Sequence, residues 1–116
     1  MKNFRRIKRR HLFYYLQVKE VQTRKLIGYL VDITPFGLRL VSDQPFEPNL
    51  ETELCMHLPD EMGKKKSISF HAKSIWKGKD VNSDFWAIGF EIGELGRETL
   101  QIIEDMINEY GFEDLD

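Results

Sequence analysis

Hydrophobic and polar residues alternate along most of the chain, and this alternation predicts β-structure. Short stretches rich in aromatic and β-branched residues are separated by turn-forming sequences such as TPFG, PDEMG and GKDVNSD. We therefore predict six strands, over residues 11–21, 26–34, 38–42, 51–58, 67–77 and 85–92. The TPFG sequence has the composition of a type I turn, with proline second and glycine fourth. The second and third strands should thus form an antiparallel hairpin.

Two changes of phase mark the second half of the chain. In the fifth strand the alternation slips at Ile75, which predicts a β-bulge or bend at that residue. From residue 95 to residue 110 the apolar residues fall at helical spacing, and Gly111 follows where helices often end. The predicted fold is therefore mainly β, a small six-stranded antiparallel barrel with a C-terminal α-helix packed over one opening.

Length and composition limit the remaining possibilities. A chain of 116 residues is expected to form one domain with one core. It has no run of about 18 apolar residues, so we expect no membrane insertion. The sequence ELCMHL predicts that the single cysteine, Cys55, is a buried strand thiol in a reducing compartment. Because no apolar segment follows the basic N-terminal residues, we expect no secretory signal and a cytoplasmic location.

Charge is distributed unevenly along the chain. Residues 1–10 contain six Lys and Arg and no acidic residue, whereas the remainder contains 11 Lys and Arg against 19 Asp and Glu. We therefore expect a flexible basic arm over residues 1–10, a barrel with its helix over 11–112, and an acidic tail over 113–116. The acidic body argues against binding of long nucleic acids, which usually requires a basic face. A short basic arm is better suited to a small, highly charged anion.

The arm and the hairpin supply the candidate binding residues. Two pairs of arginines in the arm are four residues apart, and either spacing suits a ligand with several acceptor groups: Arg5 with Arg9, and Arg6 with Arg10. In DITPFG, strand alternation places Asp32 and Thr34 on one face, with Val31 and Ile33 on the other. Gly37 leaves the following backbone free of side-chain bulk.

A guanine nucleotide satisfies this set of groups. Arginine binds phosphate bidentately, stacks on a purine, or donates to guanine O6 and N7. A carboxylate such as that of Asp32 accepts from the N1–H and N2–H₂ groups of guanine, the donors that adenine lacks. Arginines together with a carboxylate therefore favour guanine and phosphate in one ligand.

The order of these features resembles the PilZ domain, a receptor for cyclic di-GMP with a split β-barrel. The resemblance rests on the spaced arginines, on DITPFG beginning 22 residues after Arg10, and on GLRLVS, AKSIWK, AIGFEI and the terminal helix. It implies a non-enzymatic domain without cofactor or metal that binds cyclic di-GMP and signals through contact with an effector protein, as a monomer or weak homodimer. The implied ligand-binding residues are Arg5, Arg6, Arg9, Arg10, Asp32, Thr34 and Gly37. Two departures are Thr34 in place of serine, and Pro35 and Phe36 where smaller residues are usual, so that Phe36 would either crowd the ligand or stack on it.

Alternatives remain open from the sequence. The domain could be a PilZ-like adaptor that no longer binds nucleotide and acts only through a protein partner, or the arm could bind nucleic acid. The arm could also be a solvated terminus, or lie on the acidic helix. Asp32 could act simply as a turn carboxylate that caps the TPFG backbone. The three histidines have no metal-like spacing, and the aromatic residues Trp76, Phe85, Trp86 and Phe90 are expected to fill the barrel.

Overall fold

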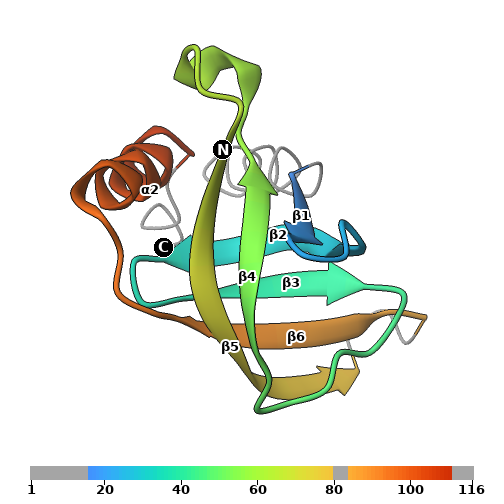
Figure 1. Cartoon of the computed structure of the whole chain (residues 1–116). Coiled ribbons are helices and arrows are strands. Elements are labelled where there is room, and N and C mark those ends of the chain that lie inside the picture. The colour runs from blue at the N-terminus through green and yellow to red at the C-terminus, as the bar shows by residue number, and fades with distance from the viewer. Residues whose placement is uncertain (1–15, 80–83, 111–116) are drawn as a thin grey trace.

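The alternating segments form strands in the computed structural model, which describes residues 16–79 and 84–110 (Figure 1). The strands are β1 (Gln17–Glu20), β2 (Leu26–Thr34), β3 (Gly37–Ser42), β4 (Glu51–His57), β5 (Ser67–Lys79) and β6 (Trp86–Ile92). A short 3₁₀ turn, η1 (Asp60–Met62), lies between β4 and β5, and helix α2 (Arg97–Tyr110) follows β6. The strands pair antiparallel in the order β1-β2-β3-β6-β5-β4 and close into a barrel, which confirms the predicted fold class.

The predicted and observed elements agree closely within the described residues. Strand β2 has the predicted bounds, and β3, β4 and β6 differ from the prediction by one residue at one end. The predicted first strand extends too far at its C-terminal end, because Val21 begins a turn in which Arg24 has a φ of 62°. Residues 11–15 of that prediction lie outside the described part and stay untested. The predicted arm (1–10) and tail (113–116) also lie outside the described residues.

Alternation along each strand builds the core. In β4, Leu54 and Met56 are fully buried, whereas Cys55 between them points to the outer face and is half-buried. The prediction that Cys55 is buried was therefore wrong, because a strand turns successive side chains to opposite faces. In β5, residues Ile68, Phe70, Ala72 and Ser74 are all buried, as their spacing of two requires.

The predicted irregularity in β5 is confirmed as a bulge at Ile75. Against β6, Ser74 pairs with Phe90 and Trp76 pairs with Gly89, so Ile75 has no partner residue. The extra residue reverses the phase of the strand and turns Trp76 to the outer face, where it is 48% exposed.

The four aromatic residues expected in the barrel behave differently from one another. Phe90 is buried in the core. Trp76 and Phe85 are exposed, and Trp86 is half-buried beneath the ammonium groups of Lys77 and Lys79, which lie 5.6 and 4.5 Å from its ring centroid. The prediction was therefore correct only for Phe90, since the bulge and the end of the barrel place the other three outside the core.

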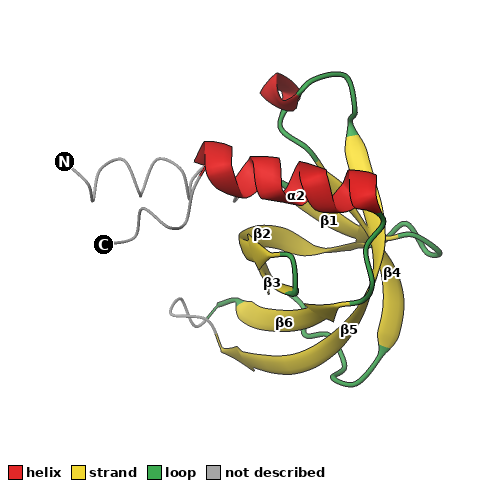
Figure 2. Cartoon of the chain, turned by 90° about the vertical axis from the view of Figure 1, so that its left-hand side faces the viewer, coloured by secondary structure: helices red, strands yellow, loops and turns green. Residues whose placement is uncertain are grey.

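Helix α2 lies over one end of the barrel and contacts β2 and β5 (Figure 2). Gly96 precedes it, and the Gly96 carbonyl accepts the first helical bond from Leu100 N–H at 2.9 Å, so the helix begins two residues later than predicted. Ile103 and Met106 are fully buried in the barrel core. The acidic residues of the helix face solvent, as predicted: Glu98, Glu104, Asp105 and Glu109.

Two polar contacts hold loops against the barrel. The hydroxyl of Ser74, which is fully buried, donates to the Glu47 carbonyl and accepts from Leu50 N–H at 3.1 Å, so it holds the β3–β4 loop against β5. At the end of β1, the Glu20 carboxylate accepts from the hydroxyls of Thr52, at 2.6 Å, and Thr23, at 2.8 Å. These two hydrogen bonds, chiefly that of Thr52, lower the pKa of Glu20 from its usual value.

Candidate functional site

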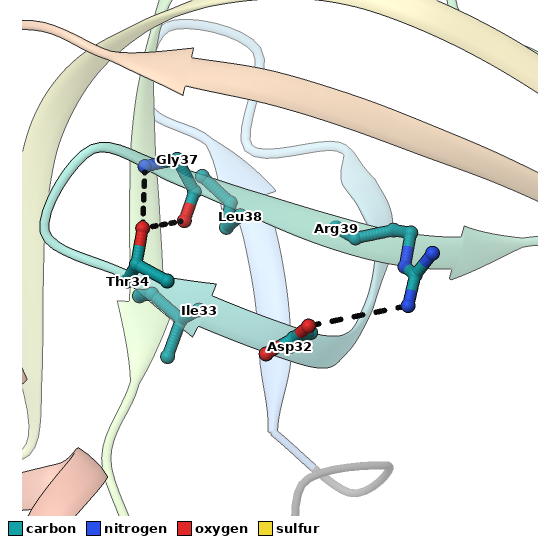
Figure 3. Close-up of a pocket in the computed structure, with 6 residues that line it drawn as sticks. All are labelled: Asp32, Ile33, Thr34, Gly37, Leu38 and Arg39. Atoms are coloured by element: carbon teal, nitrogen blue, oxygen red, sulfur yellow. Dashed lines mark hydrogen bonds and ion pairs between the residues drawn. The ribbon is translucent and has the colours of Figure 1, made fainter. Parts of the chain in front are cut away.

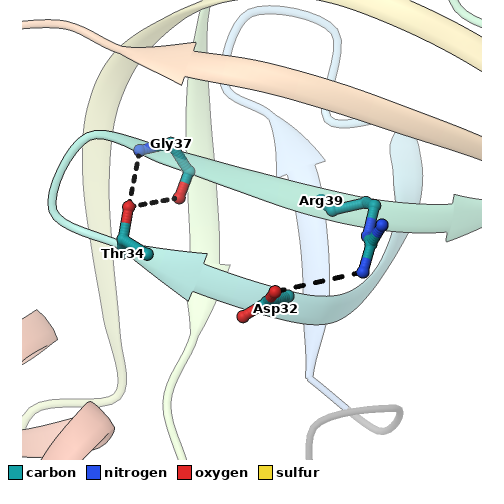
Figure 4. Close-up of polar contacts among 4 residues, drawn as sticks. All are labelled: Asp32, Thr34, Gly37 and Arg39. Carbon is teal, nitrogen blue, oxygen red and sulfur yellow. Dashed lines mark hydrogen bonds and ion pairs between the residues drawn. The ribbon is translucent and has the colours of Figure 1, made fainter. Parts of the chain in front are cut away.

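A bulge in β2 directs Asp32 toward Arg39. Leu30 pairs with Leu40 and Asp32 pairs with Arg39, so Val31 is an extra residue in β2. The Asp32 carboxylate lies 4.0 Å from the Arg39 guanidinium, and these side chains are 40% and 49% exposed (Figure 4). As predicted, Asp32 and Thr34 share the outer face and Ile33 is buried between them. Val31 was predicted to lie on the same face as Ile33, but it is only half-buried, because it is the extra residue of the bulge.

Thr34 uses its hydroxyl to hold the β2–β3 turn. Its Oγ1 accepts from the backbone N–H of Phe36 at 3.1 Å. It also accepts from the backbone N–H of Gly37 at 3.2 Å and lies 3.4 Å from the Gly37 carbonyl, to which it can donate (Figure 4). Neither Pro35 nor Phe36 has a positive φ, as a type I turn requires. Thr34, and not Asp32, is therefore the side chain that caps this turn.

Gly37 is required by the barrel itself. A Cβ atom at this position would lie 2.7 Å from the carbonyl oxygen of Phe90 on β6, closer than Cβ atoms approach oxygen. From the sequence, Gly37 was expected to leave the following backbone free of side-chain bulk, as a ligand-binding residue would. In the structure the close neighbour is strand β6, so a side chain at residue 37 would disturb the pairing of β3 with β6.

The residues of this hairpin surround a shallow, open hollow of about 280 Å³ on the outer barrel face (Figure 3). Its lining consists of Asp32, Ile33, Thr34, Gly37, Leu38 and Arg39. Phe36 does not line it, and with 81% of its surface exposed it does not cover Asp32 or Thr34. Pockets for drug-sized ligands usually measure about 300–1,000 Å³, so the hollow alone is too small to enclose a dinucleotide.

The structure adds Arg39, which the sequence analysis had not selected. The hairpin register could have predicted it. A two-residue turn pairs Thr34 with Gly37, and the next pair along the hairpin is Ile33 with Leu38. Continued by one more pair, the register brings Asp32 opposite Arg39. A guanidinium beside a carboxylate presents donors and acceptors to one ligand.

Trp76 extends the same outer surface across four strands. Asp32 pairs with Arg39, Arg39 with Gly89, and Gly89 with Trp76, so these residues form one row over β2, β3, β6 and β5. The indole packs on two glycines, since Cβ atoms at Gly78 and Gly89 would lie 3.1 and 3.4 Å from it. An exposed aromatic ring therefore lies in the row that begins with the candidate carboxylate.

The four predicted arginines, Arg5, Arg6, Arg9 and Arg10, lie outside the described residues. Their proximity to Asp32 therefore stays a prediction. Within residues 16–79 and 84–110, His, Cys, Asp and Glu side chains form no group of three or more that could hold a metal ion. In the same part of the chain, no helix has the length and apolar character needed to span a membrane.

Comparison with known proteins identifies the family. The model of the PilZ domain matches residues 2–109, which is nearly the whole chain. The protein belongs to the PilZ domain family. PilZ domains are binding and adaptor domains, not enzymes, so the outer hollow is a candidate ligand site.

A solved structure shares the fold. The structure of the Bacillus subtilis inhibitor of motility, MotI/DgrA, superposes with a TM-score of 0.66 at 20% sequence identity. The match covers 81% of this chain and 46% of that chain, so this PilZ domain corresponds to about half of the longer protein. A comparison with curated proteins gives no match.

Proposed function

We propose that this PilZ domain is a cyclic di-GMP receptor and adaptor that binds the dinucleotide on the outer barrel face and signals by contact with a protein partner. The observation that carries the proposal is the Asp32–Arg39 pair. The two side chains face one open hollow at a separation of 4.0 Å. Asp32 begins the DITPFG motif that the family resemblance associates with the ligand, and Arg39 follows the motif on β3.

The chemistry of the pair suits guanine. The Asp32 carboxylate accepts from N1–H and N2–H₂, and Arg39 donates to a phosphate or to O6 and N7. Because their own contact is long and solvent-exposed, it contributes about 0–1 kcal/mol and is easily exchanged for contacts with a ligand. Thr34 and Gly37 contribute by holding the turn and the strand pairing that fix the position of Asp32.

The size of the hollow implies a second binding element. A dinucleotide exceeds about 280 Å³, so further groups must cover it. The arginines of the N-terminal segment supply these groups in the proposal, as Arg6 with Arg10 or as Arg5 with Arg9. Trp76 offers a flat surface for base stacking at the far end of the row of paired residues.

The proposed output is a change in the surface presented to an effector protein in a bacterial cytoplasm. The structural neighbour is named an inhibitor of motility, which makes a motility system one candidate for the partner. Surface attachment and exopolysaccharide production are further candidates that rest on family resemblance.

Isothermal titration calorimetry tests the proposal. We expect saturable binding of cyclic di-GMP that is weakened at least ten-fold by Arg10→Ala or by Asp32→Asn and is unchanged in the control Asp105→Asn, whose side chain lies on the exposed face of α2. Linear GMP should bind far more weakly. Absence of heat at millimolar ligand, or equal affinity in all variants, would refute the receptor proposal.

A second candidate is an adaptor that does not bind nucleotide. It is favoured by the Thr34 hydroxyl, whose contacts are all made within the turn, and by the Arg39 guanidinium beside Asp32. In that case calorimetry gives no signal with cyclic di-GMP, while binding to a protein partner persists in Asp32→Asn.

A further inference from the structure

Phe36 is an unusual residue for the tip of a hairpin. It is 81% exposed, more than any other large hydrophobic side chain among the described residues. Leaving a phenylalanine in water forgoes the free energy that its burial would provide. Contiguous exposed apolar patches mark interaction sites, whereas single exposed apolar residues are common. Phe36 is therefore informative because further apolar side chains lie beside it.

The backbone at Phe36 is fixed on both sides. Its N–H donates to the Thr34 hydroxyl at 3.1 Å, and its carbonyl accepts from Ile92 N–H on β6 at 2.8 Å. The β2–β3 turn is thereby attached to the last residue of β6. Figure 1 shows this turn beside the point where the chain leaves β6 and continues to α2. The aromatic ring is presented on a rigid support, which reduces the entropy that a partner's binding must offset.

A groove begins at this ring and extends toward the helix. It measures about 550 Å³ and is bounded by the turn, the end of β6 and the first half of α2. Its apolar lining consists of Pro35, Phe36, Ile92, Leu95 and Leu100. This volume is sufficient for one or two side chains of a bound peptide.

The charged residues that line the groove are both acidic, Glu94 and Glu104. Glu104 is exposed on α2, whose surface also carries the exposed acids Glu98 and Asp105. Of these, Glu98 is paired with Lys65 at 3.6 Å, and Asp105 accepts from Gln101 at 3.0 Å. The groove therefore combines an apolar floor with negative charge.

We propose that this groove docks a segment of a partner protein that carries an aromatic or aliphatic anchor flanked by Lys or Arg. The anchor packs against Phe36, Leu95 and Leu100, and the cations pair with Glu94 and Glu104. A second copy of this chain is disfavoured, because a two-fold contact would bring the same acidic residues together. The proposal goes beyond nucleotide binding and does not depend on it.

The experiment selects peptides from a random 12-residue phage library on the full chain, without cyclic di-GMP. The enriched peptide is then labelled with fluorescein, and its affinity is measured by anisotropy. We expect a consensus with Phe, Trp or Leu beside Lys or Arg. Phe36→Ala and Glu104→Lys should each weaken binding at least ten-fold, while the matched control Glu109→Lys, an exposed acid of α2 outside the groove, changes it less than two-fold.

Three results would overturn the proposal. The first is the absence of an enriched consensus, or a consensus without cationic residues. The second is an affinity that Phe36→Ala and Glu104→Lys leave unchanged. The third concerns the basic segment of this chain: if replacing Arg5, Arg6, Arg9 and Arg10 by alanine raises the peptide affinity ten-fold or more, that segment and not a partner occupies the groove. Because no assay here contains nucleotide, these outcomes are independent of the receptor test.

Discussion

Replacing Thr34 by valine isolates the role of one hydroxyl group. Valine keeps the branched shape of threonine and its preference for strands, but it cannot accept a hydrogen bond. In the folded protein, Thr34 Oγ1 accepts from two backbone N–H groups, at 3.1 and 3.2 Å. The variant therefore removes these two bonds while leaving the side-chain volume nearly unchanged.

The expected loss follows from the exposure of the turn. An intramolecular hydrogen bond contributes about 0.5–1.5 kcal/mol net. Because these hydrogen bonds are exposed, water can satisfy the released N–H groups. Each hydrogen bond should therefore contribute a free energy in the lower part of that range. We therefore expect the free energy of unfolding to fall by about 1–2 kcal/mol in Thr34→Val.

Urea unfolding at 25 °C, followed by tryptophan fluorescence, measures this difference. Thr34→Ser is the matched control, because serine retains the oxygen atom and should differ from the wild type by less than about 0.5 kcal/mol. The reasoning would be wrong if Thr34→Val unfolded at the wild-type midpoint, or if Thr34→Ser were as unstable as Thr34→Val. The first result would mean that the turn does not need the hydroxyl, and the second that the methyl group contributes as much to stability as the hydroxyl does.

Three further predictions concern polar contacts elsewhere in the domain. Asp32→Asn should lower the free energy of unfolding by less than about 1 kcal/mol, since the ion pair of Asp32 with Arg39 is exposed. The same variant should weaken cyclic di-GMP binding about ten-fold or more. A large change in the urea midpoint would contradict this prediction. Ser74→Ala should cost about 1–3 kcal/mol in urea unfolding, because it leaves Leu50 N–H without its acceptor, and a wild-type midpoint would count against it. Glu20→Gln should destabilise by at most about 1 kcal/mol near neutral pH. Since the folded pKa of Glu20 is lowered, its contribution is complete above the usual value of 4.5 and disappears as the pH falls through the folded value. The stability difference between wild type and Glu20→Gln should therefore be present at pH 6 and shrink as the pH is lowered below 4.5, and a difference that widens in acid would refute this assignment.

Only part of the candidate site could be placed from the local sequence pattern. The strand pattern correctly placed Asp32 and Thr34 on one face, and the turn composition correctly joined β2 to β3. The same register would have led to Arg39, had it been continued across the hairpin. Trp76 could not be assigned in this way, since its outward position depends on how the bulge at Ile75 is accommodated against β6.

The strands, the helix and the PilZ motif can be recognised in the sequence alone, because alternation, turn chemistry and helical spacing act over a few neighbouring residues. The tertiary structure decided what each motif residue contacts. In the folded chain the Thr34 hydroxyl accepts hydrogen bonds from its own turn, Gly37 packs against the Phe90 carbonyl, and Phe36 lines the groove beside α2. The Thr34 hydrogen bonds stay within the turn, whereas the last two contacts join segments as far apart as residues 36 and 104. Only closure of the barrel fixes which of these distant segments meet.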